Sequence, residues 1–288
     1  MRRKLLAGVG SILGVQFLLP LFVSLNAFAA ELSEIRERGY LVVAVKDNRP
    51  PMGFLNSADQ LSGFEIDIAR KLAEDLLGDA DAVELVPTRN VDRLDAVIEN
   101  RVDVAIAALT ITEPRRRIVS FSYPYYLDGT AFITRLPTDS APDILTLHDL
   151  QLGTIAVLER SSTVAQLSYL LPAAQQVGVG SYLEAQTLVE SGAVDAFAGD
   201  ASVLAGWTME GGALMNHSML PDIISAEPLA VVLPKGQQYS PLQTAVNKAI
   251  QRWYKEGWLQ ARSQFWELPE GVVPEGVLPS ALDAEGTR

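Results

Sequence analysis

The chain of 288 residues contains no cysteine and only two histidines. The absence of cysteine excludes disulfides, thiol catalysis and a lipid anchor on cysteine. Two histidines alone do not make an ordinary zinc site, so we expect no metal and no cofactor. Positive charge is also scarce, because 23 Lys and Arg face 35 Asp and Glu, for a net charge of −12. Such an excess of negative charge repels phosphate backbones, so we expect no nucleic-acid partner.

In its hydrophobic and charged fractions, the chain has the composition of a globular protein. Hydrophobic residues make up 48% of the chain and charged residues 20%. These proportions argue against a disordered chain, and the length suits two domains of ordinary size.

Residues 1–29 have the pattern of a secretory signal peptide. Three basic residues precede an apolar run over residues 5–25, and Ala27 and Ala29 are the small residues that a signal peptidase reads. The apolar run is nearly long enough to span a bilayer, so an uncleaved anchor is the alternative. Either reading places the rest of the chain outside the cytoplasm, and we expect a periplasmic protein.

Apolar runs typical of strands alternate with helical patterns along most of the chain. In the clearest helix, Phe64, Ile68, Leu72 and Leu76 recur every four residues. Strands separated by helices predict parallel sheets covered on both faces. We expect strands at residues 40–45, 83–86, 102–109, 154–158 and 194–198, and helices at 64–77, 91–100, 163–171 and 181–191.

Two further apolar runs, residues 130–135 and 228–234, are interpreted as segments that cross between two domains. Residues 240–258 would then form a helix that packs back on the first domain. Beyond Pro269 the chain is rich in Pro, Gly and Glu, which predicts a flexible C-terminal tail over residues 269–288.

Five motifs in this order resemble the bacterial extracellular solute-binding proteins for polar amino acids, which feed ABC transporters. They lie within residues 34–266 and read LSGFEIDIA (61–69), RVDVAIAALTITEPR (101–115), FSYPYY (121–126), GAVDAF (192–197) and KEGW (255–258). The resemblance implies an α/β fold of the type II periplasmic binding proteins, with two doubly wound sheets joined by two crossover strands. We expect lobe 1 to comprise residues 30–132 and 229–268, and lobe 2 residues 133–228.

An amino-acid ligand carries a carboxylate and an ammonium group, and a buried site must pair both charges. Arg115 is our candidate for the carboxylate, because it follows a strand end and a guanidinium binds a carboxylate with two parallel donors. The family places an arginine there for this purpose. Thr112 should cap the short helix that carries Arg115. The resemblance further implies that the Ala108 carbonyl accepts from the ligand ammonium and that Thr110 contacts the ligand.

Asp200 is our candidate for the ammonium group. It ends the strand at residues 194–198, at the carboxyl edge where open α/β sheets bind ligands, and the family carries an aspartate there. A helix N-cap is the alternative role for Asp200. Asp195 starts the same strand and should lie at the far edge.

The second lobe should offer donors after its first strand, and Ser161 and Ser162 fit this expectation. Arg160 stands where the family has a glycine, so a non-glycine residue must adopt the local turn. In the first loop, the aromatic residue that covers the ligand in many relatives is displaced to Phe54, and Arg49 lies near the site. Arg49 and Arg160 could neutralise an acidic side chain, unless both point to solvent. We therefore expect Glu, Asp, Gln or Asn as ligand.

The predicted function is the binding of a free amino acid by lobe closure and its delivery to an inner-membrane ABC permease, by a monomer without catalytic residues. One alternative is an enzyme similar to cyclohexadienyl dehydratase, with Glu65 and Glu159 as the nearest acids, although nothing in the sequence assigns them catalysis. The other is a sensor that presents its ligand to a receptor.

Overall fold

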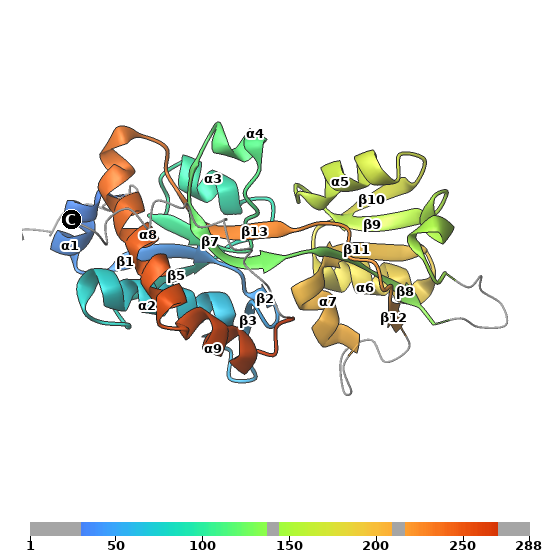
Figure 1. Ribbon diagram of the computed structural model, residues 1–288, viewed down its shortest axis with the longest axis horizontal. Coiled ribbons are helices and arrows are strands. Elements are labelled where there is room, and N and C mark those ends of the chain that lie inside the picture. Colours follow the sequence, from blue (N-terminus) through green and yellow to red (C-terminus); the bar gives the residue numbers. More distant parts are fainter. Residues whose placement is uncertain (1–29, 137–143, 209–216, 270–288) are drawn as a thin grey trace, which may run out of the picture.

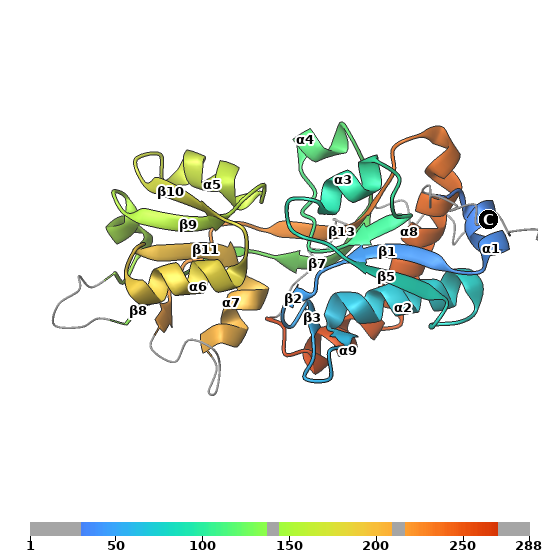
Figure 2. The ribbon, with the colours of Figure 1, turned by 180° about the vertical axis from the view of Figure 1, so that it is seen from behind.

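The structure is a computed structural model that describes residues 30–136, 144–208 and 217–269. The predicted signal peptide lies outside the described residues, as does nearly all of the predicted tail. Figure 1 shows two lobes side by side along the longest axis of the molecule, and Figure 2 shows the same division from behind. In the part of the chain that is described, no helix has both the length and the apolar character that crossing a bilayer requires.

The first lobe is built on a five-stranded sheet in the order β5-β1-β6-β13-β7. The first three of these strands are parallel, whereas β13 runs antiparallel to both of its neighbours. Every residue of β1 is buried, as expected of a strand covered on both faces. The strands are β1 (Leu41–Val45), β5 (Val83–Pro87), β6 (Val104–Ile106), β7 (Ser120–Asp128) and β13 (Glu227–Leu233).

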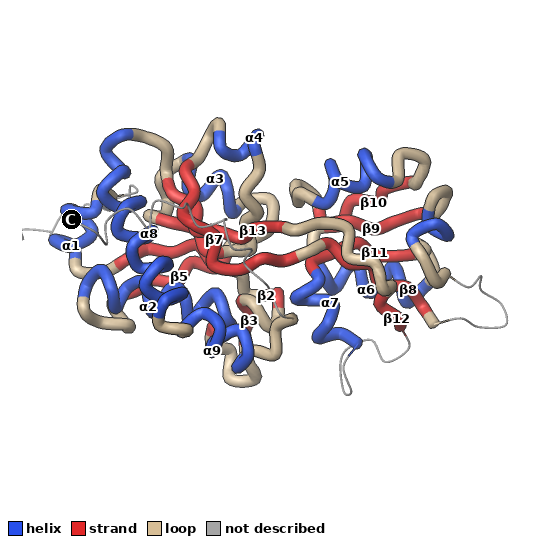
Figure 3. Tube along the Cα trace, in the orientation of Figure 1, coloured by secondary structure: helices blue, strands red, loops and turns tan. Residues whose placement is uncertain are grey.

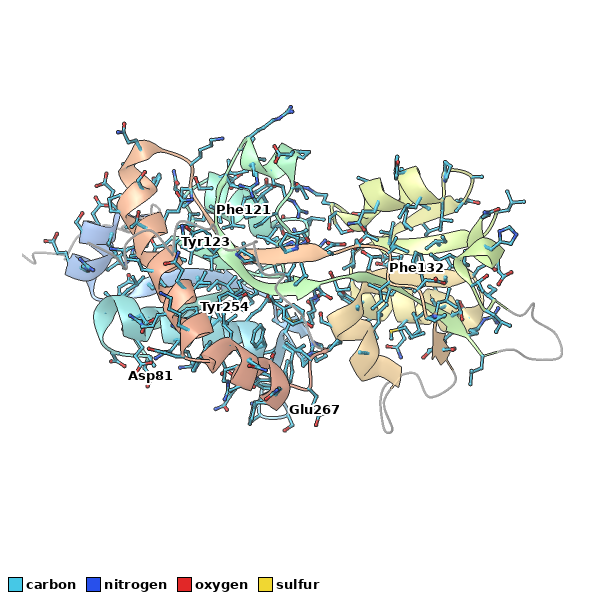
Figure 4. The ribbon with its side chains drawn as sticks, viewed as in Figure 1. Asp81, Phe121, Tyr123, Phe132, Tyr254 and Glu267 are labelled. Atoms are coloured by element: carbon cyan, nitrogen blue, oxygen red, sulfur yellow. The ribbon has the colours of Figure 1, made fainter. Side chains whose placement is uncertain are left out.

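The helices of the first lobe bury the faces that the sequence predicted. In α2 the four residues at helical spacing, from Phe64 to Leu76, are all buried. The predicted return helix is also present, since α8 packs against β7 and the Tyr254 hydroxyl donates to the Pro124 carbonyl at 3.0 Å. Figure 4 shows Tyr254 beside the strand that carries Phe121 and Tyr123. The helices are α1 (Leu32–Arg38), α2 (Phe64–Leu77), α3 (Arg93–Ile98), α4 (Glu113–Arg116), η2 (Gln237–Tyr239), α8 (Ser240–Lys255) and α9 (Trp258–Phe265).

A small three-stranded antiparallel sheet follows β1 in the chain and stands at the side of the first lobe that faces the second (Figure 3). It consists of β2 (Asn48–Arg49), β3 (Gly53–Leu55) and β4 (Leu61–Ser62). In β2 the exposed Asn48 alternates with the buried Arg49. Because successive side chains of a strand point to opposite faces, this short strand turns Arg49 into the protein.

The second lobe contains a five-stranded sheet in the order β10-β9-β11-β8-β12. Its core includes Phe132, which Figure 4 labels within this lobe. The strands are β8 (Thr130–Arg135), β9 (Thr154–Leu158), β10 (Gln175–Val179), β11 (Ala196–Asp200) and β12 (His217–Met219), and the helices are η1 (Leu147–Leu150), α5 (Thr163–Leu170), α6 (Tyr182–Ser191) and α7 (Ala201–Thr208). The predicted α/β fold with two sheets is therefore confirmed.

The chain passes between the lobes twice, once from β7 to β8 through Gly129 and once in the segment that leads to β13. The two passages touch, because a Cβ atom on Gly129 would lie 2.9 Å from the Ser225 carbonyl oxygen. Only glycine allows this approach. The predicted lobe boundary at residues 132/133 falls inside β8, all of whose pairing is with the second sheet. We therefore propose to move that boundary to Gly129 and the returning one to Glu227.

Candidate ligand-binding site

The carboxyl ends of the central strands of both sheets lie where the two lobes meet, and side chains from the two lobes are in direct contact there. Asn90 donates to the Glu159 carbonyl at 2.6 Å, and Ser162 Oγ lies 3.3 Å from Thr110 Oγ1. We call this region the interlobe site. It contains these sequence-predicted residues: the side chains of Arg49, Thr110, Arg115, Ser161, Ser162 and Asp200 and the main chain of Ala108. Of the other predicted residues, Thr112 caps α4, Phe54 packs within the first lobe and the Arg160 side chain lies at the rim.

Arg115 reaches this site from α4, whose first turn is organised as predicted. Thr112 is the N-cap and accepts from the Arg115 amide at 3.4 Å. The guanidinium donates to the carbonyls of Thr110 at 3.0 Å and Arg160 at 3.1 Å. Burial lowers the pKa of Arg115, while the negative charges of Glu227 and Asp200 oppose that shift. Because its described hydrogen-bond partners are carbonyls, Arg115 retains a positive charge that can pair with an incoming anion.

Asp200 ends β11, on the second lobe, and faces the same region as Arg115. Its Oδ2 lies 2.6 Å from Arg49 Nη2 and also accepts a hydrogen bond from the Tyr182 hydroxyl. Asp195, at the start of the same strand, instead accepts from the Thr154 amide at 2.7 Å at the other end of the sheet. The predicted contrast between the two aspartates is therefore confirmed.

Arg49 does not point to solvent, since it is only 2% exposed. It is paired with Asp200 and lies 3.7 Å from Asp128, and its guanidinium is 5.8 Å from the centre of the Tyr182 ring. Burial opposes its charge, but Asp200 and the other nearby negative groups outweigh burial and raise the pKa of Arg49. Carboxylates of the chain thus already balance the positive charge that we expected to neutralise a ligand.

Arg160 adopts a left-handed backbone conformation, with φ of 58°, at the position where the resemblance implies a glycine. Its guanidinium extends to the first lobe, where it contacts Asp95 at 3.0 and 3.3 Å and the Val91 carbonyl. The side chain is 52% exposed. Arg160 therefore joins the rims of the two lobes, and its charge is directed to Asp95 rather than to the interior of the site.

The remaining predicted residues of the site are Ala108, Ser161 and Ser162, and Phe54 lies outside it. The Ala108 carbonyl accepts from Arg93 at 2.8 Å, which leaves one lone pair for another donor. Ser162 Oγ donates to Glu227 at 2.6 Å, whereas Ser161 Oγ is buried and has no partner among the described residues. Phe54 packs against Trp266 of the first lobe in a T-shaped arrangement, with ring centres 5.9 Å apart.

The sequence model of the bacterial extracellular solute-binding proteins, family 3, matches residues 41–269. The chain belongs to this family.

Relatives in the solute-binding family 3 bind different amino acids, according to their names. The chain is 31% identical to a glutamine-binding protein of Geobacillus stearothermophilus over 202 residues, which covers 69% of this chain and 74% of the relative. It is 29% identical to the L-cystine-binding protein TcyJ of Escherichia coli over 249 residues, or 85% and 89% of the two chains.

Solved structures confirm that the fold is that of the type II periplasmic binding proteins. The solute receptor for L-cysteine of Neisseria gonorrhoeae superposes with a TM-score of 0.74 at 27% identity, covering 82% of this chain and 93% of the receptor. The ancestral amino acid-binding protein AncCDT-1, described as a precursor of cyclohexadienyl dehydratase, gives a TM-score of 0.72 at 29% identity, covering 82% and 98%. These relatives are solute-binding proteins.

Glu227 is a site residue of this family member that the sequence analysis missed. It is 2% exposed and accepts hydrogen bonds from both lobes and from the passage between them. Burial alone would raise the pKa of Glu227, but hydrogen bonds from four neutral donors lower it. These four donors are Ser162 Oγ (2.6 Å), Thr130 Oγ1 (2.6 Å), Thr110 Oγ1 (2.8 Å) and Gln166 Nε2 (2.8 Å). Ser225 Oγ, in the passage that leads to β13, is a fifth donor at 3.0 Å. The only sequence signal was a charged residue directly before the apolar run at 228–234.

Glu65 and Arg93 were also not assigned to the site. Glu65 is completely buried at the start of α2, where its Oε1 accepts from the Ala108 amide and the Tyr125 hydroxyl, both at 2.6 Å. Its Oε2 has no hydrogen-bond partner among the described residues. Arg93 donates to the carbonyls of Ala107 and Ala108 from α3. Both side chains thus hold the turn that follows β6, which sets the position of the predicted ligand-binding carbonyl.

Proposed function

We propose that this protein binds a free amino acid between its two lobes, outside the cytoplasm, and delivers it to an ABC permease of the inner membrane. The observation that carries the proposal is the placement of Arg115 and Asp200, since each lobe presents one of the two charges that an amino acid requires. The named relatives bind glutamine, cystine or cysteine, which supports a zwitterionic ligand.

Closure depends on the ligand because of this division of charge. A ligand carboxylate on Arg115 pairs a half-buried cation of the first lobe. The ligand ammonium group would bind the Ala108 carbonyl of the first lobe and Asp200 of the second. A ligand that contacts both lobes binds the closed arrangement more tightly than the open one, and it therefore shifts the population toward closure. The direct contacts between Asn90 and Glu159 and between Thr110 and Ser162 add stability only when the lobes meet.

Within the expected set of Glu, Asp, Gln and Asn, the two acidic ligands are less well supported. Arg49 and Arg160, the two cations expected to neutralise it, are paired with Asp200 and Asp95. We keep an amino acid of the Glu, Asp, Gln and Asn set as the proposed ligand. We also propose a periplasmic, monomeric protein, with a signal peptide at residues 1–29 and the division into lobes given above.

The similarity to AncCDT-1 favours one second candidate, a dehydratase-like enzyme that uses the same site. Glu65 is the buried carboxyl group that could serve such a reaction, because one of its oxygens lacks a partner. Incubation of the purified protein with prephenate or arogenate tests this candidate. Turnover that is abolished in Glu65→Gln would favour the enzyme, whereas binding without product favours the transport protein.

The proposed function is tested by calorimetry and thermal shift with the twenty amino acids. A ligand that binds only the folded protein raises its melting temperature, because at 100 times Kd it adds about 2.7 kcal/mol to the free energy of unfolding. We expect one or a few polar amino acids to bind with 1:1 stoichiometry. The absence of binding by every amino acid would contradict the proposal.

A further inference from the structure

Glu227, the first residue of β13, is a buried carboxylate whose acceptor capacity is used by the chain itself. A carboxylate offers about four lone-pair sites, and five donors occupy those of Glu227, so none is left for a ligand. Oε1 accepts from Thr130 at 2.6 Å, Gln166 at 2.8 Å and Ser225 at 3.0 Å, and Oε2 accepts from Ser162 at 2.6 Å and Thr110 at 2.8 Å.

Three of these donors lie close to the pivot of the two lobes. Thr110 belongs to the first lobe, where it forms a β-bridge with Leu229, two residues beyond Glu227. Thr130 directly follows the glycine at which the two passages touch, and Ser225 supplies the carbonyl that it touches. A rotation of the lobes about this point displaces groups beside it only slightly. These three hydrogen bonds are therefore compatible with both an open and a closed arrangement.

The other two donors belong to the body of the second lobe. Ser162 is the N-cap of α5, and Gln166 lies one turn further along the helix. Because residues four apart share one face of a helix, α5 presents both side chains together to Glu227. A hydrogen bond is lost beyond about 3.5 Å, so a displacement of α5 by on the order of 1 Å breaks both. These two hydrogen bonds require the lobes to be closed.

The ionised state of Glu227 makes the loss of these two donors costly. Burial alone would raise the pKa of Glu227, but the hydrogen bonds from Ser162 and the other neutral donors lower it, so the carboxylate is charged at neutral pH. Hydrogen bonds to an ionised acceptor are roughly twice as strong as those between neutral groups. Opening the lobes would thus replace two strong contacts of a buried charge.

We propose that Glu227 is a positioning residue that stabilises the closed arrangement of the lobes through Ser162 and Gln166, without touching the ligand. All of its partners belong to the chain, so it raises the fraction of closed molecules even before a ligand arrives. A ligand that binds the closed form then binds more tightly, whatever its side chain. The effect on affinity rests on the proposed function, whereas the effect on closure does not.

The first experiment needs no ligand. Small-angle X-ray scattering compares the unaltered protein with Glu227→Gln and Gln166→Met. Glu227→Gln removes the charge and puts an N–H group where one oxygen accepts, and Gln166→Met keeps the length of the side chain but removes the donor. We expect the radius of gyration of the ligand-free protein to increase in both variants, and more in Glu227→Gln. An unchanged radius in a folded Glu227→Gln protein would overturn the inference.

The second experiment uses every amino acid that binds the unaltered protein. Calorimetry should show that Glu227→Gln weakens the binding of each by about 10-fold and Gln166→Met by about 3-fold. The ratio of the affinities for any two amino acids should stay the same, because Glu227 does not contact the ligand. A variant that changes this ratio by about 10-fold or more would show that Glu227 contacts the ligand, and it would overturn the inference.

The matched controls are Glu84→Gln on β5 and Gln175→Met on β10, both at exposed positions. Neither should change the radius of gyration or the affinity. If Glu227→Gln does not fold, Gln166→Met decides by the same two criteria. Failure of every amino acid to bind would remove the proposed function, but the scattering of the ligand-free proteins would still decide whether Glu227 stabilises closure.

Discussion

The two lobes contribute different chemistry to the site that they share. The first lobe supplies the cations Arg49, Arg93 and Arg115, and the last two donate to main-chain carbonyls. The second lobe supplies serine hydroxyls and the carboxylate of Asp200. On the proposed assignment, the two ends of a zwitterion go to different lobes, with the anionic end on the first. Either lobe alone would leave one ligand charge unpaired, so high affinity requires both.

The largest expected effect comes from replacing Arg115, the proposed partner of the ligand carboxylate. Arg115→Met should weaken amino-acid binding at least about 100-fold, because the ligand carboxylate would be buried without a partner, at a cost of about 2–5 kcal/mol. Arg116→Met is the control, since Arg116 lies on the same helix with an exposed side chain. Calorimetry on both variants measures the difference. Equal losses would show that the first lobe does not hold the anionic end.

The second lobe is tested at its carboxylate. Asp200→Asn should weaken binding about 10- to 100-fold, less than Arg115→Met, because the Ala108 carbonyl can still accept from the ammonium group. Asp195→Asn should leave affinity unchanged and lower stability, since Asp195 accepts from the Thr154 amide at the other end of the sheet. Affinity by calorimetry and melting temperature by calorimetric scanning separate the two aspartates. Loss of affinity in Asp195→Asn would contradict the assignment.

A third prediction concerns Asp128, the last residue of β7, and the pH dependence of the free energy of unfolding. Burial, and then the negative charge of Asp200, raise the pKa of Asp128 to about 7, although Arg49 and the Ser202 hydroxyl oppose this. An acid with a raised pKa in the folded state binds more protons there than in the unfolded state. Its contribution to the free energy of unfolding therefore falls as pH rises from about 4 to 7, and it is constant above that range.

The measurement is urea unfolding of the protein and of Asp128→Asn at pH 4.5, 6.0 and 7.5. We expect the difference in unfolding free energy between the two proteins to change by about 1–3 kcal/mol over this range, in favour of the variant at the higher pH. A difference that is independent of pH would show that Asp128 is ionised throughout.

The smallest effect is expected at the rim of the lobes. Arg160→Met removes the contacts with Asp95, and it should weaken binding by no more than about 5-fold because exposed ion pairs contribute about 0–1 kcal/mol. The loss should diminish further at high salt. Calorimetry at two salt concentrations tests this. A loss as large as that of Arg115→Met would mean that Arg160 contacts the ligand.

The parts of the site that follow regular elements were predictable from the sequence. Asp200 ends a strand and Thr112 caps a helix, so alternation and capping patterns place both. The parts that depend on contacts between distant segments were not. The direction of Arg49 depends on a strand of two residues, that of Arg160 on Asp95 in the other lobe, and Glu227 has donors from four separate segments. No local pattern encodes such partners.

The contact between the two interlobe passages at Gly129 has a mechanical consequence. A single tether would allow the lobes to twist, tilt and slide, whereas two tethers that touch at one point leave mainly one rotation, about an axis through that point. Each opening and closing would then retrace the same arc. The spacing between Arg115 and Asp200 would be restored at every cycle, so the closed form would favour a ligand whose length matches this spacing.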